Sequence, residues 1–126
     1  MNKSLKSIKQ RVGNIQFGLL RVRDENDNFT LQVKIAENDG MMLSCLITDT
    51  VPGQDLLYKN VTLIQKSQGD YLYISGIITD ELAKNKKILS VEINKACWFI
   101  KKSRGNVSWL QQKYLYETLQ DKIEAA

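Results

Sequence analysis

Two threonines, Thr48 and Thr50, stand in a polar segment that follows an apolar run near the middle of the chain. The segment, residues 46–61, has the sequence LITDTVPGQDLLYKNV and contains the only proline of the 126 residues. Hydroxyl groups and free backbone N–H groups at the end of a strand can hold a phosphate. Residues of the same types also make ordinary loops. The segment therefore has two interpretations, a phosphate site or a simple connection between strands.

The sequence contains no histidine, which narrows the chemistry that the protein can perform. Ser-His-Asp and Cys-His nucleophiles, histidine-ligated haem and histidine-containing zinc sites are excluded. The two cysteines, Cys45 and Cys97, lie in separate apolar runs and are too few for a tetrahedral thiolate site. We expect both to be reduced core residues rather than a disulfide. If the protein is an enzyme, we expect a bound cofactor to supply the chemistry.

Three carboxylates, Asp24, Glu25 and Asp27, cluster in one predicted hairpin turn. Residues of this kind favour turns and stay hydrated there. A general acid–base pair instead needs two groups that converge in a pocket. We therefore expect these carboxylates to shape the turn, and we expect no metal site.

Aromatic residues in or beside the apolar runs could stack on a nucleic-acid base or a flavin ring, namely Tyr71, Tyr73, Trp98 and Trp109. Core packing is the alternative role for an aromatic side chain in an apolar strand. Trp98 differs from the others because the sequence FIKK follows it. A basic and aromatic strand edge of this kind suits an anionic aromatic ligand.

The composition is that of one soluble globular domain, with 43% hydrophobic and 25% charged residues. A net charge of +4 suits an anionic ligand, or simply keeps the surface soluble. No apolar run is long enough to cross a membrane, and the N-terminal sequence MNKSLKSIKQRVG lacks the apolar centre of a signal peptide. We therefore expect a cytoplasmic protein without a membrane partner.

The hydrophobic pattern predicts a mainly β fold, an antiparallel barrel of six to seven strands with a helix at each end of the chain. Residues 1–13 are predicted to form a short amphipathic helix. Residues 103–126 are predicted to form a helical tail, in which Leu115, Leu119 and Ile123 are aligned. Between these helices the pattern predicts strands over 14–23, 29–36, 41–48, 61–66, 71–79, 88–94 and 95–102. Residues 1–126 would then be a single domain with its barrel over 14–102.

Several of these segments follow one another in a distinctive order: IQFGLLRV, the charged hairpin RDENDNF, GMMLSCLIT, VTLIQKSQGDYLYISGIITD and ILSVEINKACWF. This succession resembles the pyridoxamine phosphate oxidase-like split barrels, specifically their small general-stress-protein branch. The resemblance covers roughly residues 5–102, and the YxxISG core of the fourth segment is its most specific part. It lies in the pattern and order of the strands, without a diagnostic catalytic motif.

The resemblance implies a homodimer of barrels with flavin mononucleotide in a groove at the dimer interface, and a flavin-dependent oxidoreductase activity. The positions that hold the phosphate in this family correspond here to Gln32, Lys34, Thr48, Asp49 and Thr50. We expect Lys59 to add a phosphate contact, and Trp98 or a tyrosine to pack near the flavin ring. The resemblance assigns no catalytic residue.

Two positions depart from the residues that are usual in the family. Thr30-Leu31-Gln32 stand where the second strand usually carries Arg-Pro, and Val51-Pro52-Gly53-Gln54 stand where the following loop usually carries a lysine. Asp49 would also place a carboxylate near the phosphate, which is unfavourable unless a cation offsets it.

Two alternative hypotheses therefore stay open. The first is a non-enzymatic binding module for nucleic acid or a protein partner. It is based on the net charge and on basic residues around Trp98, namely Lys95, Lys101, Lys102 and Arg104. The second is a structural dimer that holds no small ligand.

Overall fold

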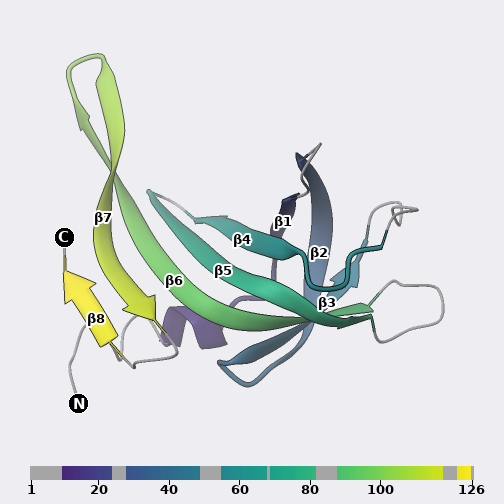
Figure 1. Ribbon diagram of the computed structural model, residues 1–126. Helices are drawn as coiled ribbons and strands as arrows, with labels where there is room; N and C mark the ends of the chain where they lie inside the picture. The colour runs from purple at the N-terminus through teal and green to yellow at the C-terminus, as the bar shows by residue number, and fades with distance from the viewer. Residues whose placement is uncertain are drawn as a thin grey trace.

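The computed structural model describes residues 10–23, 28–48, 55–67, 69–81, 88–117 and 122–125 of the chain. A single helical turn over residues 10–13 precedes the first strand. The rest is a β structure with eight strands (Figure 1): β1 Phe17–Arg23, β2 Asn28–Asn38, β3 Met42–Ile47, β4 Asn60–Ser67, β5 Asp70–Glu81, β6 Ile88–Arg104, β7 Val107–Glu117 and β8 Lys122–Ala125.

Six of the strands close into an antiparallel barrel in the order β1-β2-β3-β6-β5-β4, and β4 pairs back with β1. The closing pair is β3 with β6, in which Leu43 lies opposite Val91 and Cys45 lies opposite Leu89. Closure gives each strand of the ring a partner on both sides, which is a common solution for all-β proteins. The antiparallel β-barrel that the sequence predicts is thus confirmed.

The interior of the barrel is an apolar core, because alternate side chains of each strand point inward. On β1, for example, Leu20 and Val22 are fully buried whereas Arg21 is exposed. No polar or charged residue is buried among the residues that the structure describes. Each buried aliphatic side chain stabilises the fold by about 1.5–3 kcal/mol. The prediction of two reduced core cysteines is confirmed for Cys45, which is a free thiol in the core. Cys97 is also a free thiol, but it is only partly buried and lies outside the core cluster.

Segments outside the sheet cover both ends of the barrel. β5 runs from Asp70 at one end to Glu81 at the other. Beside its first residue, Arg11 Nη2 donates to Asp70 Oδ1 at 2.7 Å, and the neighbouring Val12 is buried. Beside its last residue, the backbone N–H of the buried Leu56 donates to Glu81 Oε1 at 3.0 Å. The core is therefore completed by an apolar side chain from the segment before β1 and by another from the connection between β3 and β4.

The turn between β2 and β3 falls where the sequence ENDG predicts one. The Asp39 carboxylate accepts the backbone N–H groups of Met42 at 2.7 Å and Met41 at 2.9 Å. These hydrogen bonds favour the charged form and lower the pKa of Asp39. Asp39 is therefore a turn residue.

β6 and β7 continue beyond the barrel as a two-stranded ribbon. The last β6 residue paired with β5 is Ile100, which lies opposite Asp70. Past it, β6 pairs only with β7, and the two strands are joined by a two-residue turn, Gly105-Asn106. We call residues 101–110 the arm; it rises away from the barrel in Figure 1.

The predicted helical tail is wrong over the described residues, because 107–117 form β7 and 122–125 form β8. β7 forms because β6 offers it a partner: the edge of β6 from Lys95 to Arg104 pairs with β7 along its length. A Gly-Asn pair between two strand-like runs is also a hairpin signal. Of the predicted N-terminal helix, residues 10–13 are helical, and residues 1–9 lie outside the described part.

The predicted strands over 88–94 and 95–102 are one strand, β6, of 17 residues. The pairing with β5 shifts here, because Ser75 lies opposite Lys95 whereas Gly76 lies opposite Ile93. Asn94 is therefore a bulge residue, and buried positions change from Leu89, Val91 and Ile93 to Ala96.

Candidate functional site

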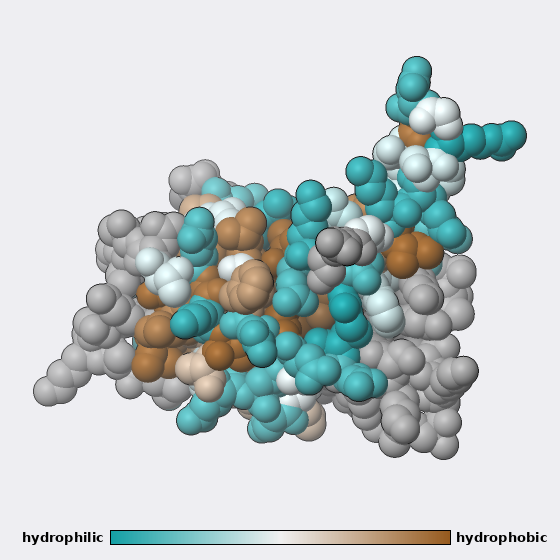
Figure 2. Space-filling view, turned by 180° about the vertical axis from the view of Figure 1, so that it is seen from behind, coloured by the Kyte–Doolittle hydropathy of each residue, from teal (hydrophilic) through white to brown (hydrophobic). Residues whose placement is uncertain are grey.

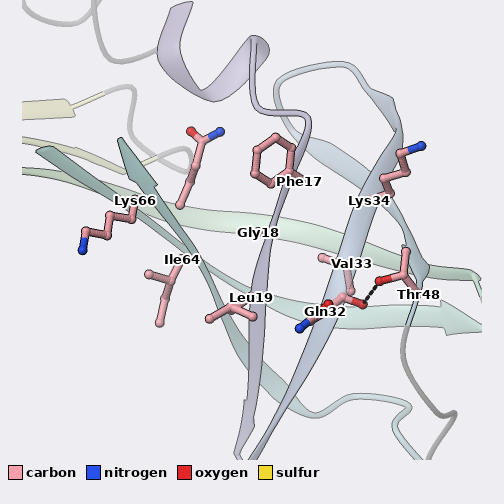
Figure 3. Close-up of a pocket in the computed structure, with 10 residues that line it drawn as sticks. Phe17, Gly18, Leu19, Gln32, Val33, Lys34, Thr48, Ile64 and Lys66 are labelled. Carbon is pink, nitrogen blue, oxygen red and sulfur yellow. Dashed lines mark hydrogen bonds between the residues drawn. The ribbon is translucent and has the colours of Figure 1, made fainter. Parts of the chain in front are cut away.

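A groove opens where two neighbouring strands of the barrel stop pairing. β1 pairs with β2 along its whole length, from Phe17 to Arg23. It pairs with β4 only from Leu19 onward, with Leu19 opposite Ile64. The space at the unpaired ends of β1 and β4 has a volume of about 480 Å³ (Figure 3). This volume lies within the range of small-molecule sites, about 300–1,000 Å³.

The groove has an apolar bed. Phe17 and Leu19 of β1 point outward and are 60% and 44% exposed, and Ile64 of β4 lies beside Leu19. Inward-facing positions form the floor at the end of the barrel, namely Gly18, Val33 and Gln65. An exposed phenylalanine and leucine side by side on a barrel wall are the kind of surface that a ligand or partner covers.

The charged and polar groups of the groove stand around this bed. Lys34 of β2 lies directly opposite Phe17 in the β1–β2 pairing, and Lys66 of β4 lies on the other side of Phe17 (Figure 3). Both lysines are exposed. The Thr48 hydroxyl donates to the Gln32 carbonyl at 3.2 Å, and the Thr48 backbone N–H donates to the same oxygen at 2.9 Å. The groove thus combines apolar area with two cations and one anchored hydroxyl.

Three of the residues predicted to bind the cofactor lie together in this groove: Gln32, Lys34 and Thr48. Asp49 and Thr50 lie outside the described residues, so the structure gives no position for them.

The structure does not bring Lys59 and Trp98 to the groove. Lys59 precedes β4 at the end opposite Lys66, where its carbonyl accepts the Ile78 N–H at 3.0 Å. Trp98 lies on the side of β6 that faces Leu72 and packs against the core, with the Arg11 guanidinium 5.0 Å from its ring.

Phe17, Leu19, Ile64 and Lys66 line the groove but were not among the predicted site residues. A signal for the first two was present in the sequence. In FGLL, residues 17–20, the exposed Phe17 and Leu19 alternate with Gly18 and Leu20, which belong to the core face. The strand is therefore apolar on both faces. A barrel strand of this kind is expected to be covered on its outer side. Lys66 had no such signal, because its place depends on the pairing of β1 with β4.

The outer wall of the barrel continues from the groove across two more strands, β5 and β6. The pairings place Lys66 opposite Tyr71 and Tyr71 opposite Phe99, and in the next row Ile64 opposite Tyr73. The Tyr73 and Phe99 rings are 5.2 Å apart. Figure 2 shows hydrophobic side chains exposed among hydrophilic ones on one face of the barrel. The predicted aromatic residues Tyr71 and Tyr73 therefore lie on the outer wall.

Within the described residues, neither the Cys45 thiol nor a metal cluster offers an alternative site. Burial raises the pKa of the Cys45 thiol to about 12, so Cys45 stays protonated and unreactive at neutral pH. The described residues contain no group of three or more His, Cys, Asp and Glu side chains that could hold a metal ion.

Comparison of the chain with protein-family models, curated proteins and solved structures finds no match. Within the part of the chain that the structure describes, no helix has the length and apolar character needed to span a membrane.

Proposed function

We propose that the groove binds flavin mononucleotide and that the protein works as a homodimeric flavin-binding barrel. The observation that carries the proposal is the convergence of Gln32, Lys34 and Thr48 in one groove. The resemblance to the oxidase-like split barrels assigns phosphate binding to these same three positions. A bound flavin would supply electron transfer to or from a redox partner.

The residues of the groove fit both halves of this ligand. Phe17, Leu19 and Ile64 offer apolar area to a planar ring system. Lys34 and Lys66 offer positive charge to a phosphate, and neither has a carboxylate partner among the described residues. Lys66 lies on a different strand from the arginine that is usual in the family, so it can replace the missing charge from another side. The Thr48 hydroxyl would have to turn from the Gln32 carbonyl to donate to the ligand.

A second copy of the chain would complete the groove. Phe17 and Leu19 are 60% and 44% exposed, so the groove of one chain is open on its outer side. Ligand pockets usually bury most of the ligand surface, which an open groove does not do. A homodimer interface over β1 and β4 would cover these side chains and enclose the ring. The interface would be self-complementary, because two-fold symmetry brings the same patch to both sides.

The test is a titration of the purified protein with flavin mononucleotide and, separately, with riboflavin, followed by flavin fluorescence. We expect saturable binding of the nucleotide and a preference for it over riboflavin. K34Q and K66Q should each reduce that preference by roughly tenfold, since a hydrogen bond to a charged group contributes about 1.5–3 kcal/mol. K102Q is the matched control, because it removes the same charge from the arm.

Two results would contradict the proposal. One is the absence of any fluorescence change or rise in melting temperature with added nucleotide. The other is equal binding of riboflavin and the nucleotide with no effect of K34Q or K66Q. Analytical sedimentation tests whether the protein is a homodimer. L19K should convert the dimer into a monomer, because it places a charge in the proposed interface. A dimer that binds no flavin would instead favour the hypothesis of a purely structural dimer.

A further inference from the structure

The arm is a protein surface with no core of its own. Every residue of 101–110 is exposed, and the two strands pair only with each other there. An isolated two-stranded ribbon is at best marginally stable in water. This ribbon is held because β6 continues without a break from the barrel and because the Lys101 N–H donates to the Gly69 carbonyl at 2.8 Å.

The arm and the parts of β6 and β7 next to it, residues 93–116, carry the entire positive excess of the protein. Residues 93–116 contain no Asp or Glu and five cations: Lys95, Lys101, Lys102, Arg104 and Lys113. Elsewhere in the chain, 13 Lys and Arg residues face 14 Asp and Glu residues. Such an asymmetry concentrates the positive potential at one end of the molecule and attracts polyanions.

An aromatic groove lies at the base of the arm. It has a volume of about 370 Å³ and is lined by Tyr71, Tyr73, Lys101, Ser108, Trp109 and Leu110. Trp109 is 46% exposed. The Lys66 ammonium lies 5.8 Å from the Tyr71 ring at the far side of this groove. Aromatic faces bordered by cations are the combination that stacks bases while it neutralises phosphates.

We propose that the arm and the aromatic groove bind single-stranded nucleic acid. Bases stack on Tyr71, Tyr73 and Trp109, and the backbone phosphates contact Lys101, Lys102 and Arg104. Single strands are favoured over duplexes because the rings are reached only by unstacked bases. The proposal does not depend on flavin binding, since the flavin groove lies across β1, β2 and β4 and shares no lining residue with the aromatic groove; only Lys66 lies beside both.

The polarity of the arm favours nucleic acid over a membrane surface. A hairpin that inserts into a bilayer carries apolar and aromatic residues at its tip, where they reach the acyl chains. Here the pair next to the turn is Arg104 and Val107, and Val107 is the one apolar side chain beside Gly105 and Asn106. Trp109 and Leu110 lie back at the base, and Figure 2 shows the arm as largely hydrophilic.

The test is fluorescence anisotropy of a labelled oligothymidylate of roughly 12 nucleotides, a length that suits one small binding surface. We expect binding that weakens between about 50 mM and about 200 mM salt, with a log–log slope of about −2 for three phosphate contacts. The triple variant K101Q/K102Q/R104Q should lose at least tenfold in affinity and flatten the slope. W109A should lose at least fivefold, and W109F should restore most of that loss because it keeps a stacking ring.

The matched control is R21Q/R23Q/K59Q, which removes three cations from the barrel and should bind nearly as the native protein does. Circular dichroism checks that each variant is folded. Equal weakening by the arm and control variants would overturn the proposal, because net charge alone would then explain binding. No binding at low salt would overturn it as well. A third result would overturn it: the protein binds phosphatidylserine vesicles but not the oligonucleotide, and the arm variant abolishes the vesicle binding.

Discussion

Arg11 Nη2 and Asp70 Oδ1 lie 2.7 Å apart and join the segment before β1 to the first residue of β5. Both side chains are partly buried, with 31% and 19% of their surfaces exposed. The Arg11 guanidinium also lies 5.0 Å from the Trp98 ring. One arginine therefore fixes the segment that covers this end of the barrel to two different strands.

Replacement of Asp70 by asparagine should destabilise the protein by about 1–2 kcal/mol, because a charge-assisted hydrogen bond in a partly buried position is lost. Urea denaturation measures the change. D80N is the control, since Asp80 is exposed on the same strand, and it should change stability by less than about 0.5 kcal/mol. Equal effects of the two variants would show that the ion pair contributes nothing.

Replacement of Gly76 by alanine should destabilise the protein by at least about 2 kcal/mol. A Cβ atom at this position would overlap the backbone carbonyl oxygen of Glu92, so β5 and β6 would have to move apart. At Gly13 no atom lies within 4 Å of an added Cβ. G13A should therefore be neutral or stabilise the protein by up to about 1 kcal/mol. Thermal and urea melts compare the two variants, and a G76A protein as stable as G13A would contradict the close approach.

The stability of the protein should fall above about pH 9 because of one buried thiol. Burial raises the pKa of Cys45 from 9.0 to about 12. The unfolded state therefore releases this proton at lower pH than the folded state does. The contribution is fully present below about pH 9, and it is lost as the pH rises toward about 12. The expected slope is at most about 1.4 kcal/mol per pH unit.

C45A is the comparison for this pH dependence. It should be less stable than the native protein at neutral pH, since a buried side chain becomes smaller. Between about pH 8 and about pH 10 it should lose less stability, by roughly 1 kcal/mol. Urea melts at several pH values measure both proteins, which have every other residue in common. Parallel pH curves would rule out a role for Cys45.

Local patterns in the sequence were sufficient to predict the barrel strands, because burial of one face imposes a period of two. Phe29, Leu31, Val33 and Ile35 alternate with polar residues, and they lie in β2. The bulge at Asn94 explains why β6 was predicted as two strands. One extra residue shifts the alternation, and in a single sequence this shift has the same pattern as a break.

The error at the C-terminus has a different cause. The spacing of Leu115, Leu119 and Ile123 agrees with a helix, but a partner strand decides the conformation of a segment that can pair with it. β7 finds that partner in β6, whose outer edge extends past β5. Helical spacing is a local property, whereas the length of a neighbouring strand is not visible in the segment itself.

The candidate site was predictable only where its residues lie on strands with well-defined faces. Lys34 and Gln32 both lie on the outer face of β2, so their alignment follows from the alternation. Lys66 lies on β4 and Lys59 directly precedes it, yet only Lys66 reaches the groove. The pairing of β4 with β1 decides which end of β4 borders the groove. This pairing is long-range, so it cannot be predicted from the residues around either lysine.

The continuity of β6 also limits how the length of the arm can vary. Insertion of one residue on each side of the Gly105-Asn106 turn keeps the pairs in step, and the ribbon grows by one pair. Insertion of a single residue on the β7 side would instead turn Trp109 to the opposite face, because side chains alternate along a strand. Related chains with longer or shorter arms should therefore differ by matched pairs of residues, while the barrel half of the same strand stays constant in length.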